Sequence, residues 1–231
     1  MMLLAATTLA WAQGAEKSNK SDKSVHPLTL IPKVGVNYST TSLSSWVGKD
    51  AGEVKPDVKG VFGPVAGLEL EYGLNDKFSL SAAVLYSMQG RKFDNFHTRL
   101  NTGRDTRNLS VIDTQHHHYV NVPLTANYYV AERLALRAGV QVGLYVYKSG
   151  SENVFWPKEE YVDPQYRSFG SSPMAFDLSI PAGVSYALKN GLQFDLRYNF
   201  GLTKISSMSG DVEEQNRVVQ FTVGYRLPLT K

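Results

Sequence analysis

Eight segments of the chain alternate apolar and polar residues with a period of two, and this pattern restricts the fold more than any other feature. Successive side chains of a β-strand point to opposite faces, so each segment predicts a strand with one apolar face and one polar or small face. The clearest case is residues 134–147, whose apolar face carries Leu134, Leu136, Ala138, Val140, Val142, Leu144 and Val146.

Eight such strands close into a barrel whose interior is just wide enough to be filled by side chains. When the apolar face points outward, a barrel of this kind lies in a bacterial outer membrane. We therefore predict an all-β protein, an eight-stranded antiparallel up-and-down transmembrane β-barrel. The alternative is a soluble, lipocalin-like barrel with its apolar face inward, but about eight charged residues on the polar face are few for a soluble surface.

The connections between the expected strands alternate in length. Tight turns are expected at 73–76, 131–133 and 189–191, and long loops at 41–59, 90–117, 148–173 and 201–216. Short periplasmic turns and long external loops are typical of outer-membrane barrels. We therefore expect a cell outer-membrane location, with the long loops outside and, because the strand number is even, both termini periplasmic. The expected strands are 32–40, 60–72, 77–89, 118–130, 134–147, 174–188, 192–200 and 217–227.

Aromatic residues on the apolar face support this placement, because two aromatic girdles flank the apolar band of outer-membrane barrels. Three prolines within the strand patterns weaken those strand assignments, since each removes a ladder donor, and we expect bulges or bends there. The aromatic residues expected near the turn end are Tyr72, Phe78, Tyr128, Tyr186 and Tyr225, those near the loop end are Phe62, Tyr86, Phe176 and Tyr198, and the prolines are Pro64, Pro123 and Pro181.

The N-terminal region predicts export. Residues 1–12 are expected to be a signal peptide, because a short apolar run ends in the cleavage pattern Ala10-Trp11-Ala12. No basic segment precedes the run, so the natural start is expected upstream of Met1. Residues 13–30 are expected to form a polar, disordered periplasmic leader, and 31–231 the outer-membrane barrel.

Composition excludes several classes of function. The formal net charge of +3 is too small to suggest a nucleic-acid partner, and the absence of cysteine excludes disulfides, thiolate metal sites and a cysteine nucleophile. We expect no cofactor.

Several short motifs resemble a known family. Residues 33–39 (KVGVNYS) look like its first strand, 85–90 (LYSMQG) like its third, and 119–124 (YVNVPL), followed by Tyr128-Tyr129, like its isoleucine-proline-leucine strand. Residues 197–203 (RYNFGLT) and 224–227 (GYRL) look like its last two strands. The chain thus resembles the PorT-type outer-membrane β-barrel proteins of Bacteroidota. The resemblance implies the barrel fold and the outer membrane, and its namesake is associated with type IX secretion.

The inward face of the expected barrel collects equal numbers of acidic and basic residues. Buried charges are tolerated only when they are paired, so we predict an ion-pair network that plugs the lumen. A proton or ion path, or an acid pair at Glu69 and Glu71, is the alternative. The predicted network consists of Lys33, Glu69, Glu71, Arg137, Asp177, Asp195, Arg197 and Arg226.

The expected loop 90–117 carries the candidates for external contact. Arginine pairs well with phosphate, so lipid A phosphates or an acidic partner are plausible targets. His116 and His118 share a face and are weak candidates for a metal site, against the simpler interpretation of an exposed polar loop. Ser110, Asp113 and His117 suggest a hydrolase, but nothing positions a nucleophile or an oxyanion hole, and we expect no enzyme. The contact candidates are Phe93, Phe96, Arg99, Arg104 and Arg107.

The sequence therefore favours a non-catalytic outer-membrane barrel with a plugged lumen, acting through its long loops as an envelope contact or secretion-accessory protein. The expected partners are outer-membrane lipid, lipopolysaccharide and an envelope or secretion-system protein. The main alternative is a barrel that binds or transports a small or hydrophobic ligand.

Overall fold

The computed structural model describes residues 28–43, 46–48, 52–54, 58–101, 106–155, 176–204, 206–207 and 213–229. The expected signal peptide and almost all of the expected leader lie outside these residues. In the described part of the chain there is no helix long and apolar enough to cross a membrane. Eight long strands dominate this part: β1 (Thr29–Leu43), β5 (Val61–Gly73), β6 (Phe78–Asn101), β7 (Thr106–Ala131), β8 (Leu134–Phe155), β9 (Phe176–Ala187), β10 (Leu192–Gly201) and β12 (Glu213–Tyr225).

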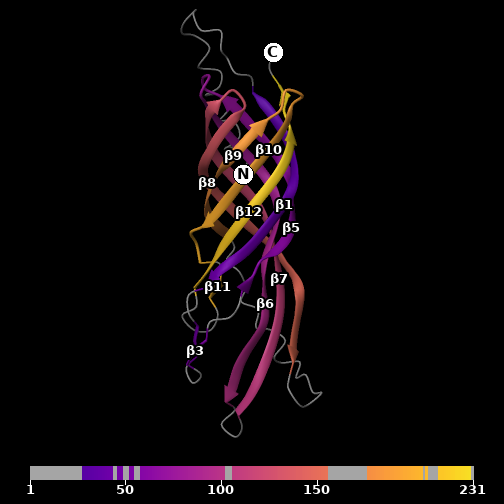
Figure 1. Ribbon diagram of the computed structural model, residues 1–231, viewed down its shortest axis with the longest axis vertical. Helices are drawn as coiled ribbons and strands as arrows, with labels where there is room; N and C mark the ends of the chain where they lie inside the picture. The colour runs from indigo at the N-terminus through magenta and orange to yellow at the C-terminus, as the bar shows by residue number, and fades with distance from the viewer. Residues whose placement is uncertain are drawn as a thin grey trace, which may run out of the picture.

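The long strands close into an antiparallel barrel in which chain neighbours are also spatial neighbours (Figure 1). Its seam is the pairing of the first strand with the last, with Val36 opposite Phe221. The predicted eight-stranded up-and-down barrel is confirmed. The short strands are β2 (Trp46–Gly48), β3 (Gly52–Val54), β4 (Val58–Lys59), β11 (Ser206–Ser207) and β13 (Leu227–Pro228).

The apolar face points outward in every long strand, as predicted. Leu136 and Val140 on β8 are 47% and 51% exposed, whereas Arg137 between them is buried in the lumen. The aromatic residues expected at both rims also lie on the outer wall. Exposed outer-wall aromatics are Phe62, Tyr72, Phe78, Tyr86, Tyr128, Phe176, Tyr186, Tyr198 and Tyr225.

The three prolines coincide with interruptions in the hydrogen-bonded ladders and leave the register unchanged. The β6–β7 ladder passes from the pair Ala82–Leu124 to the pair Leu85–Asn121 around Pro123. The β8–β9 ladder skips two positions around Pro181 in the same way, and the β5–β6 ladder begins only after Pro64. The missing proline N–H accounts for a local gap, and no bulge is needed there.

A bulge lies elsewhere, near the loop end of β8. His118 pairs with Tyr147, whereas the next residue, Tyr119, pairs with Tyr145, so Val146 is the extra residue. Strict alternation would turn Tyr147 inward, but Val146 and Tyr147 are both exposed. An extra residue in one strand changes the face of every side chain that follows it.

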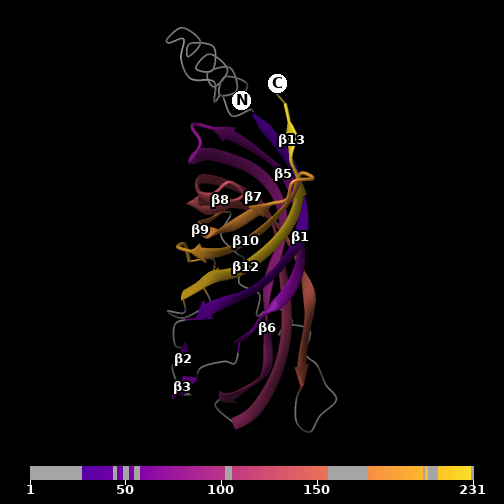
Figure 2. The same cartoon turned by 45° about the horizontal axis from the view of Figure 1, so that its top comes forward.

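The expected long loop 90–117 is largely strand, and so is the start of the expected loop 148–173. Residues 90–117 belong to a hairpin in which β6 and β7 remain paired out to Asn101 and Thr106, and β8 runs on beside β7 to Phe155. Strands of about 9–11 residues are enough to cross a bilayer. The surplus length of β6, β7 and β8 therefore projects beyond the barrel (Figures 1 and 2), and we call residues 90–101, 106–117 and 148–155 the extension. The sequence did not show this, because the polar stretch lacks an apolar face.

Candidate functional site

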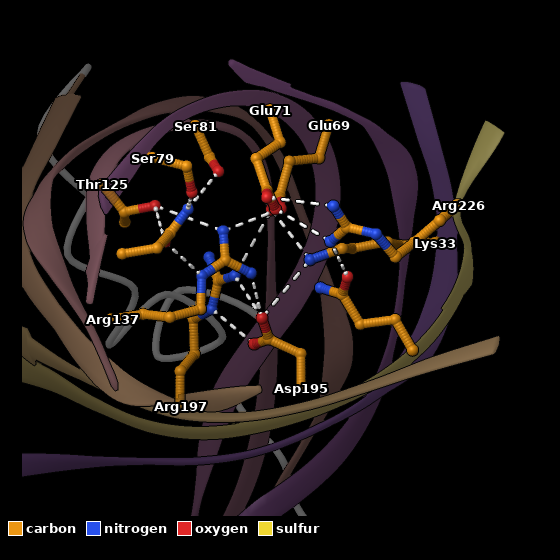
Figure 3. Close-up of polar contacts among 12 residues, drawn as sticks. Lys33, Glu69, Glu71, Ser79, Ser81, Thr125, Arg137, Asp195, Arg197 and Arg226 are labelled. Atoms are coloured by element: carbon orange, nitrogen blue, oxygen red, sulfur yellow. Dashed lines mark hydrogen bonds and ion pairs between the residues drawn. The ribbon is translucent and has the colours of Figure 1, made fainter. Parts of the chain in front are cut away.

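A layer of charged side chains crosses the lumen (Figure 3). Lys33 Nζ lies 2.8 Å from a Glu69 oxygen and 3.3 Å from an Asp195 oxygen. Arg137 pairs with both carboxylates, at 2.7 Å to Glu69. Arg197 lies 3.0 Å from Asp195 and 3.6 Å from Glu69. We call these five residues the central layer. They come from β1, β5, β8 and β10, so the layer connects opposite walls.

Glycines on neighbouring strands make room for the long basic side chains. Lys33 is opposite Gly67 on β5 and Gly224 on β12. Gly183 on β9 is opposite both Arg137 and Arg197. A Cβ added at Gly224 would come within 2.9 Å of the Lys33 side chain, and one added at Gly183 within 2.8 Å of Arg197 Cβ. An inner face with a larger residue at these positions would not accommodate the layer.

Neutral polar residues complete the hydrogen bonding of Arg137. Asn127 accepts a bond from Arg137 Nε at 2.8 Å and donates to Ser79 and Ser81. Thr125 accepts a further bond at 3.3 Å. A buried charged network is tolerated when its members are satisfied in this way. The inward alternation of β7 placed Asn127 and Thr125 inside, but the sequence did not indicate that they would hold Arg137.

A second charged cluster lies at the turn end of the barrel, and we call it the terminal cluster. Arg226 pairs with Glu71 at 3.0 Å and donates to Gln193 at 2.7 Å. The hydroxyl of Tyr129, which sequence reasoning had not singled out, donates to the same carboxylate. The terminal cluster borders a pocket of about 450 Å³, whose rim includes Asp76, Glu132, Arg133 and Lys189.

Asp177 corrects the predicted network. Its carboxylate accepts bonds from Thr203 at 2.5 Å and from Asn216 at 2.9 Å, near the loop end. Asp177 is six residues along β9 from Gly183, which faces the central arginines. At a rise of about 3.3 Å per residue this separation is about 20 Å, too far for an ion pair. The structure thus divides the predicted network into the central layer, the terminal cluster and a separate Asp177 site.

His118, a weak metal candidate from the sequence, uses its ring in hydrogen bonds to neighbouring side chains. Its Nδ1 lies 2.6 Å from the Tyr86 hydroxyl and its Nε2 lies 2.8 Å from Ser149 Oγ. The Tyr147 ring stacks on it at 3.9 Å. Both ring nitrogens are therefore occupied, and His116 is left without this partner. Among the described residues no group of three or more potential ligands gathers around a common point.

The loop contact candidates belong to the extension. Phe93, Phe96 and Arg99 lie on β6, where Phe93 pairs with Asp113, and Arg107 on β7 pairs with Leu100. Arg104 lies outside the described residues. The structure therefore places the four described candidates on two paired strands instead of on a loop.

Solved structures of small outer-membrane barrels are similar to the chain at low sequence identity. No curated protein sequence matches the chain. The attachment invasion locus protein Ail of Yersinia pestis is 13% identical, with 87% of this chain and 99% of that chain covered and a TM-score of 0.43. OprG of Pseudomonas aeruginosa is 14% identical, with 89% and 99% covered and a TM-score of 0.43. AlkL is 13% identical, with 94% and 97% covered and a TM-score of 0.44.

The family described as "Outer membrane protein beta-barrel domain" matches residues 11–207, which are most of the chain. This match agrees with the closed antiparallel barrel and its exposed apolar wall. The chain belongs to the outer-membrane β-barrel protein family, and its place is the outer membrane.

Proposed function

We propose that this protein is a non-catalytic outer-membrane barrel with a closed lumen, which acts through the extension at its loop end. The central layer carries the proposal of a closed lumen. Its five side chains are almost completely buried and join four strands around the barrel. Opening a path through them would separate buried ion pairs, which costs several kcal/mol per uncompensated charge.

The proposed orientation has both termini and the tight turns in the periplasm, and the extension outside the cell. The short connections 74–77, 132–133 and 188–191, which join β5 to β6, β7 to β8 and β9 to β10, lie at one end of the barrel. Outer-membrane barrels keep their short turns periplasmic and their longer segments external. The extension is then the part of the chain available to other molecules at the cell surface.

The proposed partners are lipopolysaccharide phosphates or an acidic surface of an envelope protein. Arg99 and Arg107 lie on the two paired strands of the extension, and Arg104 lies between them in the sequence. Arginine binds phosphate and carboxylate through two parallel hydrogen bonds. The resemblance to the PorT type makes a secretion-system component the candidate among envelope proteins.

The test removes the end of the extension without disturbing the barrel. Phe93 and Asp113 are paired, so residues 94–112 can be replaced by an Asn-Gly turn that matches the existing strands. A second variant carries Arg99→Ser, Arg104→Ser and Arg107→Ser, and Arg133→Ser at the opposite end is its matched control.

We expect the shortened and triple-serine proteins to insert and fold, but to lose a partner that co-purifies with the unaltered protein from native outer membrane. The triple-serine loss should be largest at low salt, because exposed charges are screened over about 8–10 Å at physiological ionic strength. Arg133→Ser should retain the partner. Undiminished retention by the shortened protein would place the contact elsewhere and overturn the proposal.

The turn-end pocket supports a second candidate, a barrel that binds or carries a small ligand. The pocket has room for a small molecule and is lined by charged residues of both signs, with Glu71 and Arg226 among them. Planar bilayer recordings separate the candidates. Little or no conductance is expected from a closed lumen, whereas large, steady single-channel currents would favour a transport function.

A further inference from the structure

We propose that the lumen holds a small monovalent anion, of the chloride class, on the loop side of the central layer beside Arg197. The first argument is charge. The central layer contains three basic side chains, Lys33, Arg137 and Arg197, but two carboxylates, Glu69 and Asp195. The pair of Glu71 and Arg226 nearby is neutral by itself. One positive charge is therefore uncompensated in a layer that water scarcely reaches.

The second argument is the geometry of the Arg197 guanidinium. Its Nε and Nη2 both contact Asp195, at 3.0 and 3.1 Å, so the group pairs edge-on with the carboxylate. The two hydrogens of Nη1 then point away from Asp195. Nη1 is buried and has no hydrogen-bond partner among the described residues. A guanidinium nitrogen left without an acceptor is the costly part of a buried arginine.

The third argument is the set of donors around this nitrogen. Gln220 on β12 is directly opposite Arg197, and Asn199 follows Arg197 on the same face of β10. Both amide atoms of Asn199 and both amide atoms of Gln220 are buried and unpartnered in the described part of the chain, so each amide can turn its nitrogen toward a ligand. The side chains of Arg197, Asn199 and Gln220 are at most 3% exposed.

An anion satisfies Arg197 Nη1 and the two amide nitrogens together, because each of them can donate a hydrogen bond to it. Water alone supplies acceptors for the donors but does not neutralise the charge. We propose a monovalent anion and not a phosphate monoester, because a single positive charge is uncompensated and a phosphate monoester carries about 1.5–2 negative charges.

The experiment uses the complete folded protein in zwitterionic detergent. Unfolding by urea is measured while chloride replaces gluconate from about 10 mM to about 1 M at constant ionic strength. A ligand that binds only the folded state raises the folding equilibrium about tenfold for each tenfold rise above its dissociation constant. Crystals soaked in bromide should show an anomalous peak within hydrogen-bond distance of Arg197 Nη1.

Two variants make the test specific. Arg197→Gln removes the excess charge and should abolish the halide dependence. Gln220→Glu supplies a fixed negative charge at the site, so it should stabilise the protein at low chloride and also abolish the dependence, even if Arg197→Gln does not fold. Arg133→Gln, which lies outside the lumen, should keep the dependence of stability on halide. Stability that is independent of halide, together with no bromide peak beside Arg197, would overturn the proposal.

Discussion

The central layer and the terminal cluster are built from the same kinds of side chain, but they differ in their access to water. Side chains of the central layer are 1–3% exposed. In the terminal cluster Arg226 is 25% exposed and Glu71 is 7% exposed. Each central carboxylate meets three basic groups, whereas Glu71 meets Arg226 and a tyrosine hydroxyl. We expect depth in the lumen to decide how much a lost ion pair costs, because water is less able to solvate the charge that is left behind in the central layer.

Arg137→Met should give the largest loss of stability. It removes the guanidinium shared by Glu69 and Asp195 and leaves buried carboxylate oxygens without their hydrogen bonds to Arg137, at a cost of about 3–5 kcal/mol. Denaturant unfolding in lipid vesicles, followed by circular dichroism, measures this. The double variant Arg137→Met with Glu69→Gln should recover part of the loss, and a loss below about 1 kcal/mol for Arg137→Met would show that water reaches the central layer.

Val140→Arg tests the opposite face of the same strand. Val140 is exposed on the outer wall three residues from Arg137, and a basic residue facing lipid near the midplane costs about 2–4 kcal/mol. The same vesicle assay measures the change, and Val140→Leu is the matched control with little expected effect. A tolerated arginine at this position would contradict the assignment of the outer wall to lipid.

Arg226→Met should cost less than Arg137→Met, about 1 kcal/mol, because water partly solvates the terminal cluster and Tyr129 still donates to Glu71. High salt should reduce the difference from the unaltered protein. A cost equal to that of Arg137→Met would show that the depth of an ion pair in the lumen does not determine the stability lost on its removal.

Shortening the extension by replacing residues 94–112 should have the smallest effect on stability. The β6–β7 pairs between the Phe93–Asp113 pair and the tight turns all remain. A change of connection length costs a few tenths of a kcal/mol to about 1 kcal/mol. Unfolding in vesicles and heat-dependent electrophoretic mobility check this. A large loss would mean that the extension belongs to the cooperative barrel unit.

The sequence predicted the outer wall well because the signal is local. Leu196 and Phe221 lie outward on paired strands, as their alternation required. The sequence did not reveal the length of the extension, since the polar strand segments 94–101 and 106–112 carry no apolar stripe. The bulge at Val146 was also hidden, because one extra residue changes which face follows without changing composition.

The sequence by itself determined that this chain is a barrel, which face meets lipid and which charged residues point inward, because a period of two assigns faces within one strand. Only the tertiary structure decided which of those charges meet. Lys33 and Asp195 are far apart in the chain, and closure of the barrel between β1 and β12 brings them within 3.3 Å. Asp177 has the same inward direction but lies about 20 Å along the barrel, since strand register sets the height of each side chain.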